Sequence, residues 1–307
     1  MEVDSLIEDK KMNRHDVTLP IEDDDGLRLD AKESRSLGSL LHDDYVEAKP
    51  FPHIVFDGFL PERILKLACS NFPADALKSD RIFDINYGGH HKRQILPYDC
   101  SAQAQAIFHF MNSQPVLQFL EGLSGIDGLI PDPYFEGGGY HEIDHGGLLG
   151  VHADFRINNK LHLQRRLNLL VYLNPDWDER WGGQLELWDK SMTKCETSVF
   201  PILNRCVIFN TDADSFHGHP DPLNTPDGVK RRSMALYYYT GSHQIYAEVP
   251  NRDTMYYARP HDGANTQREA RQFRTDQYLT DWLPPKLARV FFRARQKART
   301  VFSTGRA

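Results

Sequence analysis

The chain has 307 residues, of which 40% are hydrophobic and 11% aromatic, and its formal net charge is −7. This composition provides an ordinary hydrophobic core for one large domain or two small ones. The negative charge argues against a nucleic-acid-coating protein, and no apolar run approaches the roughly 18–20 residues of a membrane span.

The four cysteines, at positions 69, 100, 195 and 206, are far apart in the sequence. This spacing is typical of reduced cysteines in a cytoplasmic protein, rather than of a disulfide framework or a zinc site. The first residues are acidic where a secretory signal would be basic and then apolar, which also predicts a cytoplasmic protein.

Residues 1–45 are polar and charge-rich, and they are expected to form a poorly ordered or loosely attached leader. Residues 46–245 are expected to form one domain. It begins with a strand within 49–61 and a helix over 61–73, where a proline stands at the helix start. Residues 101–126 predict a helix with a break near Pro115.

From about residue 134 to residue 242, short apolar segments alternate with turn residues. They lie at 148–155, 167–174, 182–189, 198–210 and 231–240. Many short strands without helices between them predict an antiparallel sandwich or barrel. The segment GGHHKR (88–93) is interpreted as a solvated loop rather than a metal or phosphate site.

Residues 246–307 are expected to form a C-terminal extension. From Trp282 onward it contains seven Lys or Arg residues and no acidic residue. Its apolar residues share roughly one helical face, which predicts a basic amphipathic helix. Such a helix could contact an anionic membrane surface or an acidic partner, although docking on the acidic body of the protein is the simpler expectation.

The segment LLGVHADFR (148–156) predicts a buried strand that carries His152 and Asp154. Residues i and i+2 of a strand point to the same face, so these side chains converge. In an apolar setting they must pair, be hydrated or hold a metal, and a hydrogen-bonded pair is the commoner outcome. Two histidines beside a later strand, His217 and His219, offer a third ligand, and two imidazoles with one carboxylate make the facial triad of non-haem Fe(II) oxygenases.

Arg231 and Ser233 share one face of the predicted strand 231–240. A guanidinium with five donors in an aromatic strand favours an anionic partner, and a carboxylate suits it best. Tyr172, on another predicted strand, could reach the same carboxylate. The alternative is an arginine at the mouth of the strand and a tyrosine that caps the core.

The order Tyr140, His152-x-Asp154, Tyr172-Leu-Asn, His217 and Arg231-x-Ser233 resembles the 2-oxoglutarate- and Fe(II)-dependent dioxygenases. The resemblance covers roughly residues 50–242 and is greatest to the prolyl 4-hydroxylase-like branch. It implies a mainly β fold with flanking helices, in which a double-stranded β-helix (jelly roll, cupin-like) core follows an N-terminal helical layer.

The resemblance also implies the roles of individual residues. Fe(II) would be held by His152, Asp154 and His217, with His219 as the alternative to His217. The far carboxylate of 2-oxoglutarate would be bound by Arg231, Ser233 and Tyr172. Tyr140, Asn168 and His219 would line the site or contact the substrate. The cosubstrates would be 2-oxoglutarate and O₂, and ascorbate could keep the iron reduced.

The hypothesis is therefore a hydroxylase of an aliphatic carbon in a prolyl or other amino-acid residue, or in an amino-acid-like substrate, with release of succinate and CO₂. Asp154 favours hydroxylation over halogenation, because halogenases of this family usually lack the carboxylate. Sugars, lipid-linked intermediates and small natural products are alternative substrates. A non-catalytic jelly-roll binding module would predict a damaged triad, and a cupin-type metalloenzyme would leave Arg231, Ser233 and Tyr172 unexplained.

Overall fold

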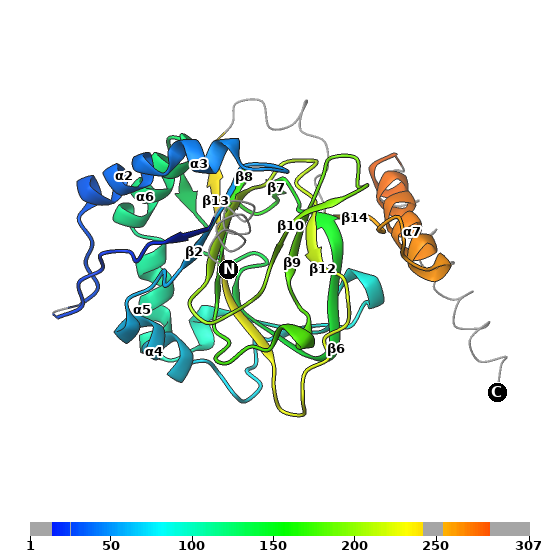
Figure 1. Ribbon diagram of the computed structural model, residues 1–307, viewed down its shortest axis with the longest axis horizontal. Helices are drawn as coiled ribbons and strands as arrows, with labels where there is room; N and C mark the ends of the chain where they lie inside the picture. The colour runs from blue at the N-terminus through cyan, green and yellow to red at the C-terminus, as the bar shows by residue number, and fades with distance from the viewer. Residues whose placement is uncertain (1–13, 25, 242–253, 283–307) are drawn as a thin grey trace, which may run out of the picture.

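The computed structural model describes residues 14–24, 26–241 and 254–282 (Figure 1). Its helices are α2 (Ala31–Leu40), α3 (His42–Glu47), α4 (Glu62–Ser70), α5 (Ala102–Met111), α6 (Gln114–Ser124) and α7 (Ala264–Trp282), with short 3₁₀ turns at η1 (Asn86–Gly88), η2 (Pro97–Asp99) and η3 (Glu179–Trp181). Its strands are β1 (Arg14–Asp16), β2 (His53–Asp57), β3 (Arg81–Phe83), β4 (His90–Ile95), β5 (Ile130–Pro131), β6 (Gly139–Ala153), β7 (Ile157–Asn158), β8 (Leu163–Tyr172), β9 (Leu185–Trp188), β10 (Cys195–Val199), β11 (Cys206–Asn210), β12 (His217–His219), β13 (Arg231–Thr240) and β14 (Met255–Tyr256).

The strands form two facing sheets that share β6. The larger sheet has the order β1-β2-β11-β8-β13-β6, and β6 also pairs with β4. The smaller sheet runs β10-β9-β12-β6, with β14 on β6 as well. The first half of β6 pairs with β13 and β4, and its second half pairs with β12 and β14. This curled two-sheet core confirms the predicted jelly roll.

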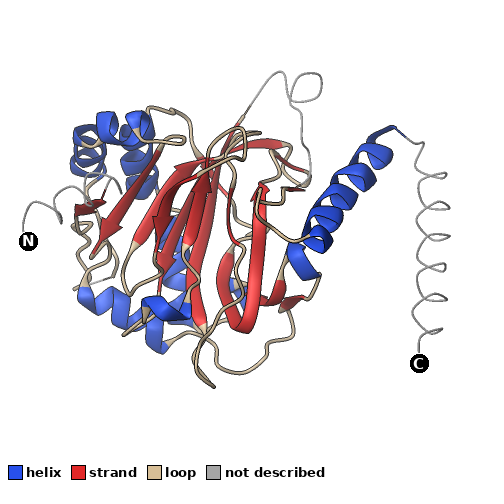
Figure 2. Ribbon diagram, turned by 45° about the vertical axis from the view of Figure 1, so that its right-hand side comes forward, coloured by secondary structure: helices blue, strands red, loops and turns tan. Residues whose placement is uncertain are grey.

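Helices cover the outer face of the larger sheet. Figures 1 and 2 show α2 to α6 on one side of the strands and α7 on the opposite side. Alternate residues of β13, from Met234 to Tyr238, point outward into a core that also contains Phe108 and Phe119 from the helices. Residues at the other alternate positions of β13, among them Arg231 and Ser233, point into the space between the sheets. The period of two therefore separates the packing face of this strand from its polar face.

Most predicted elements are confirmed. The helix expected at 61–73 is α4, and the break near Pro115 divides α5 from α6, with Pro115 in the first turn of α6. The segment 198–210 contributes the end of β10 and all of β11. The segment GGHHKR differs from the prediction, because residues 90–95 form β4 and pair with β6 instead of forming a loop.

Residues 14–47 differ from the expected loose leader. They form β1, α2 and α3, and the side chains of Leu19 and Tyr45 are fully buried. Asp30 caps α2, since its side chain accepts from the Glu33 N–H. A few well-spaced apolar residues are enough to dock this polar segment on α6 and the larger sheet. Residues 1–13 and the basic tail from Leu283 lie outside the described residues.

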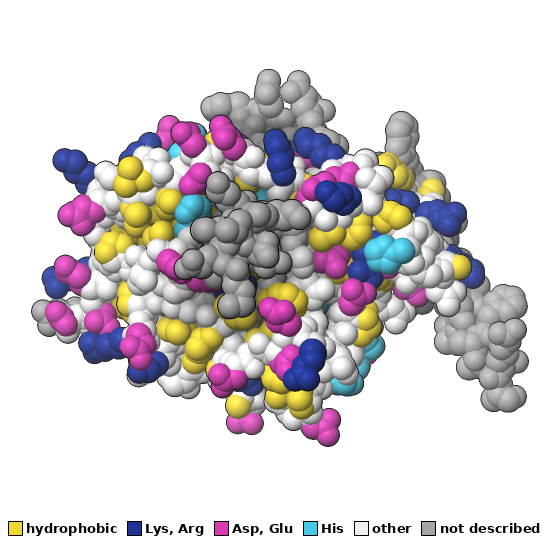
Figure 3. Space-filling model, viewed as in Figure 1, with side chains coloured by type: hydrophobic (Ala, Val, Ile, Leu, Met, Phe, Trp, Pro, Cys, Tyr) yellow, Lys and Arg dark blue, Asp and Glu magenta, His cyan; other side chains and the backbone are white. Residues whose placement is uncertain are grey.

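The surface shown in the space-filling view mixes acidic and basic side chains (Figure 3), in keeping with a modest net charge of −7. Among the described helices, none has the length and apolar character required to cross a membrane.

Candidate metal centre and cosubstrate site

Two histidines and one aspartate meet between the two sheets. His152 on β6 lies directly opposite His217 on β12, and Asp154 follows the end of β6. His152 Nε2 lies 3.6 Å from Asp154 Oδ1, and His217 Nε2 lies 3.4 Å from Asp154 Oδ2. All three side chains are buried, and their candidate ligand atoms lie within 4.8 Å of one another.

Both imidazoles are oriented by their own backbone. The Nδ1–H of His152 donates to Gly150 O (2.8 Å), and that of His217 donates to Ser215 O (2.9 Å). With the proton on Nδ1, each Nε2 carries a lone pair directed at the shared point. This is the usual arrangement of metal-ligating histidines.

Asp154 is held from behind by two side chains of β8. Asn168 Nδ2 donates to Asp154 Oδ2 at 2.8 Å, and an Arg165 nitrogen lies 3.0 Å from the same oxygen. Arg165 also donates to Asn168 Oδ1 from two nitrogens, at 2.9 and 2.6 Å. The carboxylate is therefore fixed through Oδ2, and its Oδ1 faces His152.

The electrostatics favour ligands in their metal-binding form. Burial alone would raise the pKa of Asp154, but Arg165 and the two histidines hold that pKa well below its usual value. Burial lowers the pKa of His217 to about 4, and the neighbouring His152 acts in the same direction. An ionised carboxylate and a neutral imidazole thus coexist at neutral pH, as metal ligation requires.

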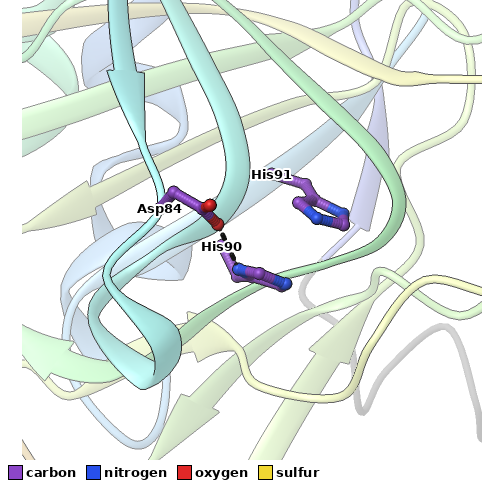
Figure 4. A group of neighbouring side chains, drawn as sticks. All are labelled: Asp84, His90 and His91. Carbon is purple, nitrogen blue, oxygen red and sulfur yellow. Dashed lines mark ion pairs between the residues drawn. The ribbon is translucent and has the colours of Figure 1, made fainter. Parts of the chain in front are cut away.

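The donor set fits Fe(II). Two imidazole nitrogens and one carboxylate oxygen come from one side of the site, the 2-His-1-carboxylate arrangement that leaves further coordination positions open. A second group, Asp84, His90 and His91, differs from it (Figure 4). There His90 pairs with Asp84, and its ring stacks on His91 with centroids 3.9 Å apart. Stacked rings direct their in-plane lone pairs side by side rather than at one point.

His219 is buried beside the triad but does not belong to it. It lines the cavity, opposite Leu149, and within the described residues neither of its ring nitrogens has a hydrogen-bond partner. Gly218 allows β12 to approach β6 closely, because a Cβ there would lie 2.7 Å from Gly150 O. The geometry therefore favours His217 over His219 as the third ligand.

A buried guanidinium lies in the same cavity. Arg231 Nε donates to Gly183 O (2.8 Å), and its NH2 group lies 3.4 Å from the Tyr172 hydroxyl. Within the described part of the chain, no acidic side chain forms an ion pair with Arg231, and burial lowers its pKa. Ser233 lines the cavity two residues further along β13. A carboxylate placed here would meet a cation and two hydroxyls.

The cavity has a volume of about 190 Å³ and is enclosed mainly by the inner faces of β4, β6, β8, β12 and β13. The three candidate metal ligands and Arg231 line the same space. Its apolar walls include Leu149, Leu185 and Phe209, and the Phe209 ring lies 4.7 Å from that of His217. Such walls keep water away from the ligands.

Tyr140 does not line the cavity. It is fully buried in the helical layer, where its ring contacts Phe108 and its hydroxyl donates to Ala68 O (3.2 Å). The reason is a register shift in β6, where the four residues from Leu149 to His152 oppose the three from His217 to His219 on β12. A bulge of this kind reverses which residues face inward, so His141 lines the site in place of Tyr140.

Three further residues of the site were not identified from the sequence. Arg165 supports Asp154, Lys92 lines the cavity from β4, and Tyr256 packs its ring 5.5 Å from that of His152. Tyr256 belongs to β14, which pairs with β6 at His152. Only Arg165 could have been noticed in the sequence, because it is a charged residue in a segment that continues as a mainly apolar strand.

Comparisons with known proteins match one segment of the chain to a family model and the fold to several solved structures. Residues 138–239 match the family model described as 2OG-Fe(II) oxygenase superfamily. A search of curated proteins finds no match. Among solved structures, a Trichoplax adhaerens prolyl hydroxylase in complex with a hypoxia inducible factor peptide is 18% identical, with 68% of this chain and 91% of that chain covered and a TM-score of 0.47.

Two other solved structures are similar at the same level. A Pseudomonas putida prolyl-4-hydroxylase is 18% identical, with 67% of this chain and 100% of that chain covered and a TM-score of 0.48. HygX from Streptomyces hygroscopicus, with nickel, 2-oxoglutarate and hygromycin B bound, is 13% identical, with coverages of 61% and 82% and a TM-score of 0.41.

The family model spans β6 to β13, the segment that contains the three candidate metal ligands and Arg231. Enzymes of this superfamily use Fe(II), 2-oxoglutarate and O₂. Residues 138–239 therefore form a dioxygenase domain of the 2OG-Fe(II) oxygenase superfamily.

Proposed function

We propose that the protein hydroxylates an aliphatic carbon of a prolyl or other amino-acid residue, or of an amino-acid-like substrate. The observation that carries the proposal is one cavity in which a His-Asp-His metal group and an Arg231 guanidinium without a described acidic partner lie together. The first suits Fe(II) and the second suits the far carboxylate of 2-oxoglutarate.

His152, Asp154 and His217 would hold Fe(II) and would leave coordination positions open for the 2-oxo acid and O₂. When bound, Fe(II) supplies the oxidative chemistry that couples conversion of 2-oxoglutarate to succinate and CO₂ with hydroxylation of the substrate carbon. Asp154 would take the ligand position that a halide would otherwise need, and this supports hydroxylation rather than halogenation.

The chain's contribution to cosubstrate binding is orientation. Gly183 O and the Tyr172 hydroxyl fix the Arg231 fork, and the fork in turn fixes the carboxylate it binds. Ser233 adds a hydroxyl from the same strand face. This anchoring directs the 2-oxo acid end toward His152, Asp154 and His217.

An amino-acid side chain suits the size of the site. The cavity of about 190 Å³ is smaller than the roughly 300–1,000 Å³ of pockets that enclose a whole drug-sized ligand. A compact group can enter it while the rest of the substrate stays outside. The prolyl 4-hydroxylase-like order of the motifs supports the same substrate class.

Anaerobic spectroscopy of the Fe(II)-loaded protein tests the site directly. Adding 2-oxoglutarate should produce a weak visible charge-transfer band, which should be absent in His152→Ala and weakened in Arg231→Ala. In air, slow succinate release should follow and should be lost in Asp154→Ala. Bound iron without such a band would overturn the proposal. Peptides and free amino acids that accelerate succinate release would then identify the substrate.

A further inference from the structure

Lys92 is a second cationic side chain that lines the cavity. It lies on β4, outside residues 138–239, which contain His152, Asp154 and His217. In the larger sheet Lys92 pairs with Ile143, and Ile143 pairs with Arg231. Side chains of residues in register across a sheet point to the same face. Lys92 and Arg231 therefore both face the interior, and both line the cavity that contains the metal ligands.

The cations on the outer face of the same strands are all paired. Arg93 lies 2.7 Å from Asp80 and 3.3 Å from Glu142, and Arg232 lies 2.9 Å from Glu142. Lys230 also contacts Glu142, at 2.9 Å. Thus carboxylates neutralise these outward-facing cations, whereas the inward-facing cations of β4 and β13, Lys92 and Arg231, form no ion pair within the described residues.

Lys92 has an aromatic neighbour but no carboxylate partner in the described residues. Its Nζ lies 5.4 Å from the centroid of the Phe83 ring. Burial lowers the pKa of Lys92 to about 8, and the more distant Asp154 offsets part of this effect. Its side chain is only partly buried, but a cation that is partly removed from water and lacks a counterion still favours an anionic ligand that pairs with it.

We propose that Lys92 binds an acidic group of the primary substrate, so that the substrate presents a carboxylate close to the carbon that is oxidised. This inference rests on the proposed function and names the chemistry of its substrate. The far carboxylate of 2-oxoglutarate is already matched by Arg231, Ser233 and Tyr172. Two strand spacings of about 4.8 Å separate the backbone of Lys92 from that of Arg231, so the two cations enter the cavity from different strands.

The test measures how ligands protect Lys92 from reductive methylation, quantified by peptide mass spectrometry under anaerobic conditions. The Fe(II)-loaded protein is labelled alone, with saturating 2-oxoglutarate, and with 2-oxoglutarate plus propionate or its neutral analogue propionamide. Propionate should slow labelling of Lys92 at least fivefold, whereas propionamide and 2-oxoglutarate alone should change it less than twofold. Lys230 in the same digest is the internal control and should label at one rate throughout.

Equal protection by propionate and propionamide, or no protection, would overturn the proposal. Protection by 2-oxoglutarate alone would also overturn it, since Lys92 would then belong to the cosubstrate site. In Arg231→Met with Fe(II) alone, propionate should still protect Lys92; loss of that protection would place propionate at Arg231 instead. A missing charge-transfer band with 2-oxoglutarate would contradict the proposed function separately, because the labelling of Lys92 does not depend on it.

Discussion

The Arg165 guanidinium lies 3.0 Å from Asp154 Oδ2, and it is sandwiched between the rings of Tyr237 (3.5 Å from its centroid) and Phe155 (4.7 Å). The carboxylate of Asp154, a candidate metal ligand, is thus also one member of a buried ion pair. Arg165 is 1% exposed, so the pair has little access to water. Its contribution to stability consequently depends on whether a metal shares the carboxylate's charge.

Replacement of this arginine should destabilise the metal-free protein more than the metal-loaded one. Removing one partner of a buried ion pair costs about 3–5 kcal/mol, because the other charge stays buried and uncompensated. In Arg165→Met, a bound divalent ion still compensates Asp154. Thermal unfolding with and without Ni(II) should show a larger metal-induced rise in Tm than in the parent protein, and an equal rise would contradict this role.

The two neighbouring histidines of β12 should differ in their effect on metal binding. His217→Ala removes a proposed ligand and should weaken Fe(II) binding by about 100-fold or more. Mutation of a residue that only orients a ligand already weakens metal binding by about 10- to 100-fold, and loss of the ligand itself should cost at least as much. His219→Ala leaves the His-Asp-His group complete and should retain one iron per chain. Equilibrium dialysis with metal analysis distinguishes them. Retention of iron in His217→Ala together with its loss in His219→Ala would reverse the assignment.

The metal-free protein should lose stability on acidification. The folded-state pKa of His217 is about 4, against an ordinary value near 6.5. Between these values the unfolded chain binds more protons, so stability is complete above about pH 6.5 and falls as the pH decreases toward 4. The loss from this group is about 3 kcal/mol. Urea unfolding at pH 7.5, 6 and 5 measures it, and His217→Gln should show a shallower pH dependence.

The Arg231 guanidinium should determine affinity for 2-oxoglutarate. Hydrogen bonds to a charged group contribute about 1.5–3 kcal/mol, so Arg231→Met should raise the KM for 2-oxoglutarate by about 10- to 100-fold. The adjacent Arg232 points outward to Glu142 and provides a matched control. Uncoupled succinate formation gives both KM values. A similar KM increase in Arg232→Met would indicate a general structural effect instead.

Local spacing predicted the parts of the site whose residues are two apart along the chain. His152 and Asp154, and likewise Arg231 and Ser233, are i and i+2 pairs, and the period of two places each pair on one face. The strands themselves follow from apolar runs between turn residues, and β13 has the predicted bounds.

The remaining parts of the site depend on irregular strand pairing, which the spacing of residues in the sequence does not reveal. The shift in β6 turns Tyr140 outward, and a second shift, where β8 pairs with β13, lets Arg165 and Asn168 meet although they are three residues apart. Lys92 enters the site only because β4 joins the larger sheet beside β6. The segment GGHHKR, which contains Lys92, is interpreted from the sequence as a solvated loop, and cross-strand pairing with β6 outweighs that local signal.

Gly183 should be important for cosubstrate binding although it has no side chain, because its backbone positions Arg231. Its carbonyl accepts from Arg231, and a Cβ on it would lie 2.6 Å from Leu223 Cδ2 and 3.1 Å from Arg231 Cδ. Gly183→Ala should therefore displace the guanidinium and raise the KM for 2-oxoglutarate about tenfold, the effect of roughly 1.4 kcal/mol.

Gly182→Ala is a close control, since both glycines have a positive φ (71° and 75°) but a Cβ on Gly182 meets only Gln184 Oε1 at 3.8 Å. Both variants should lose stability through backbone strain. If both raise the KM equally, strain in the loop rather than contact with Arg231 controls cosubstrate binding.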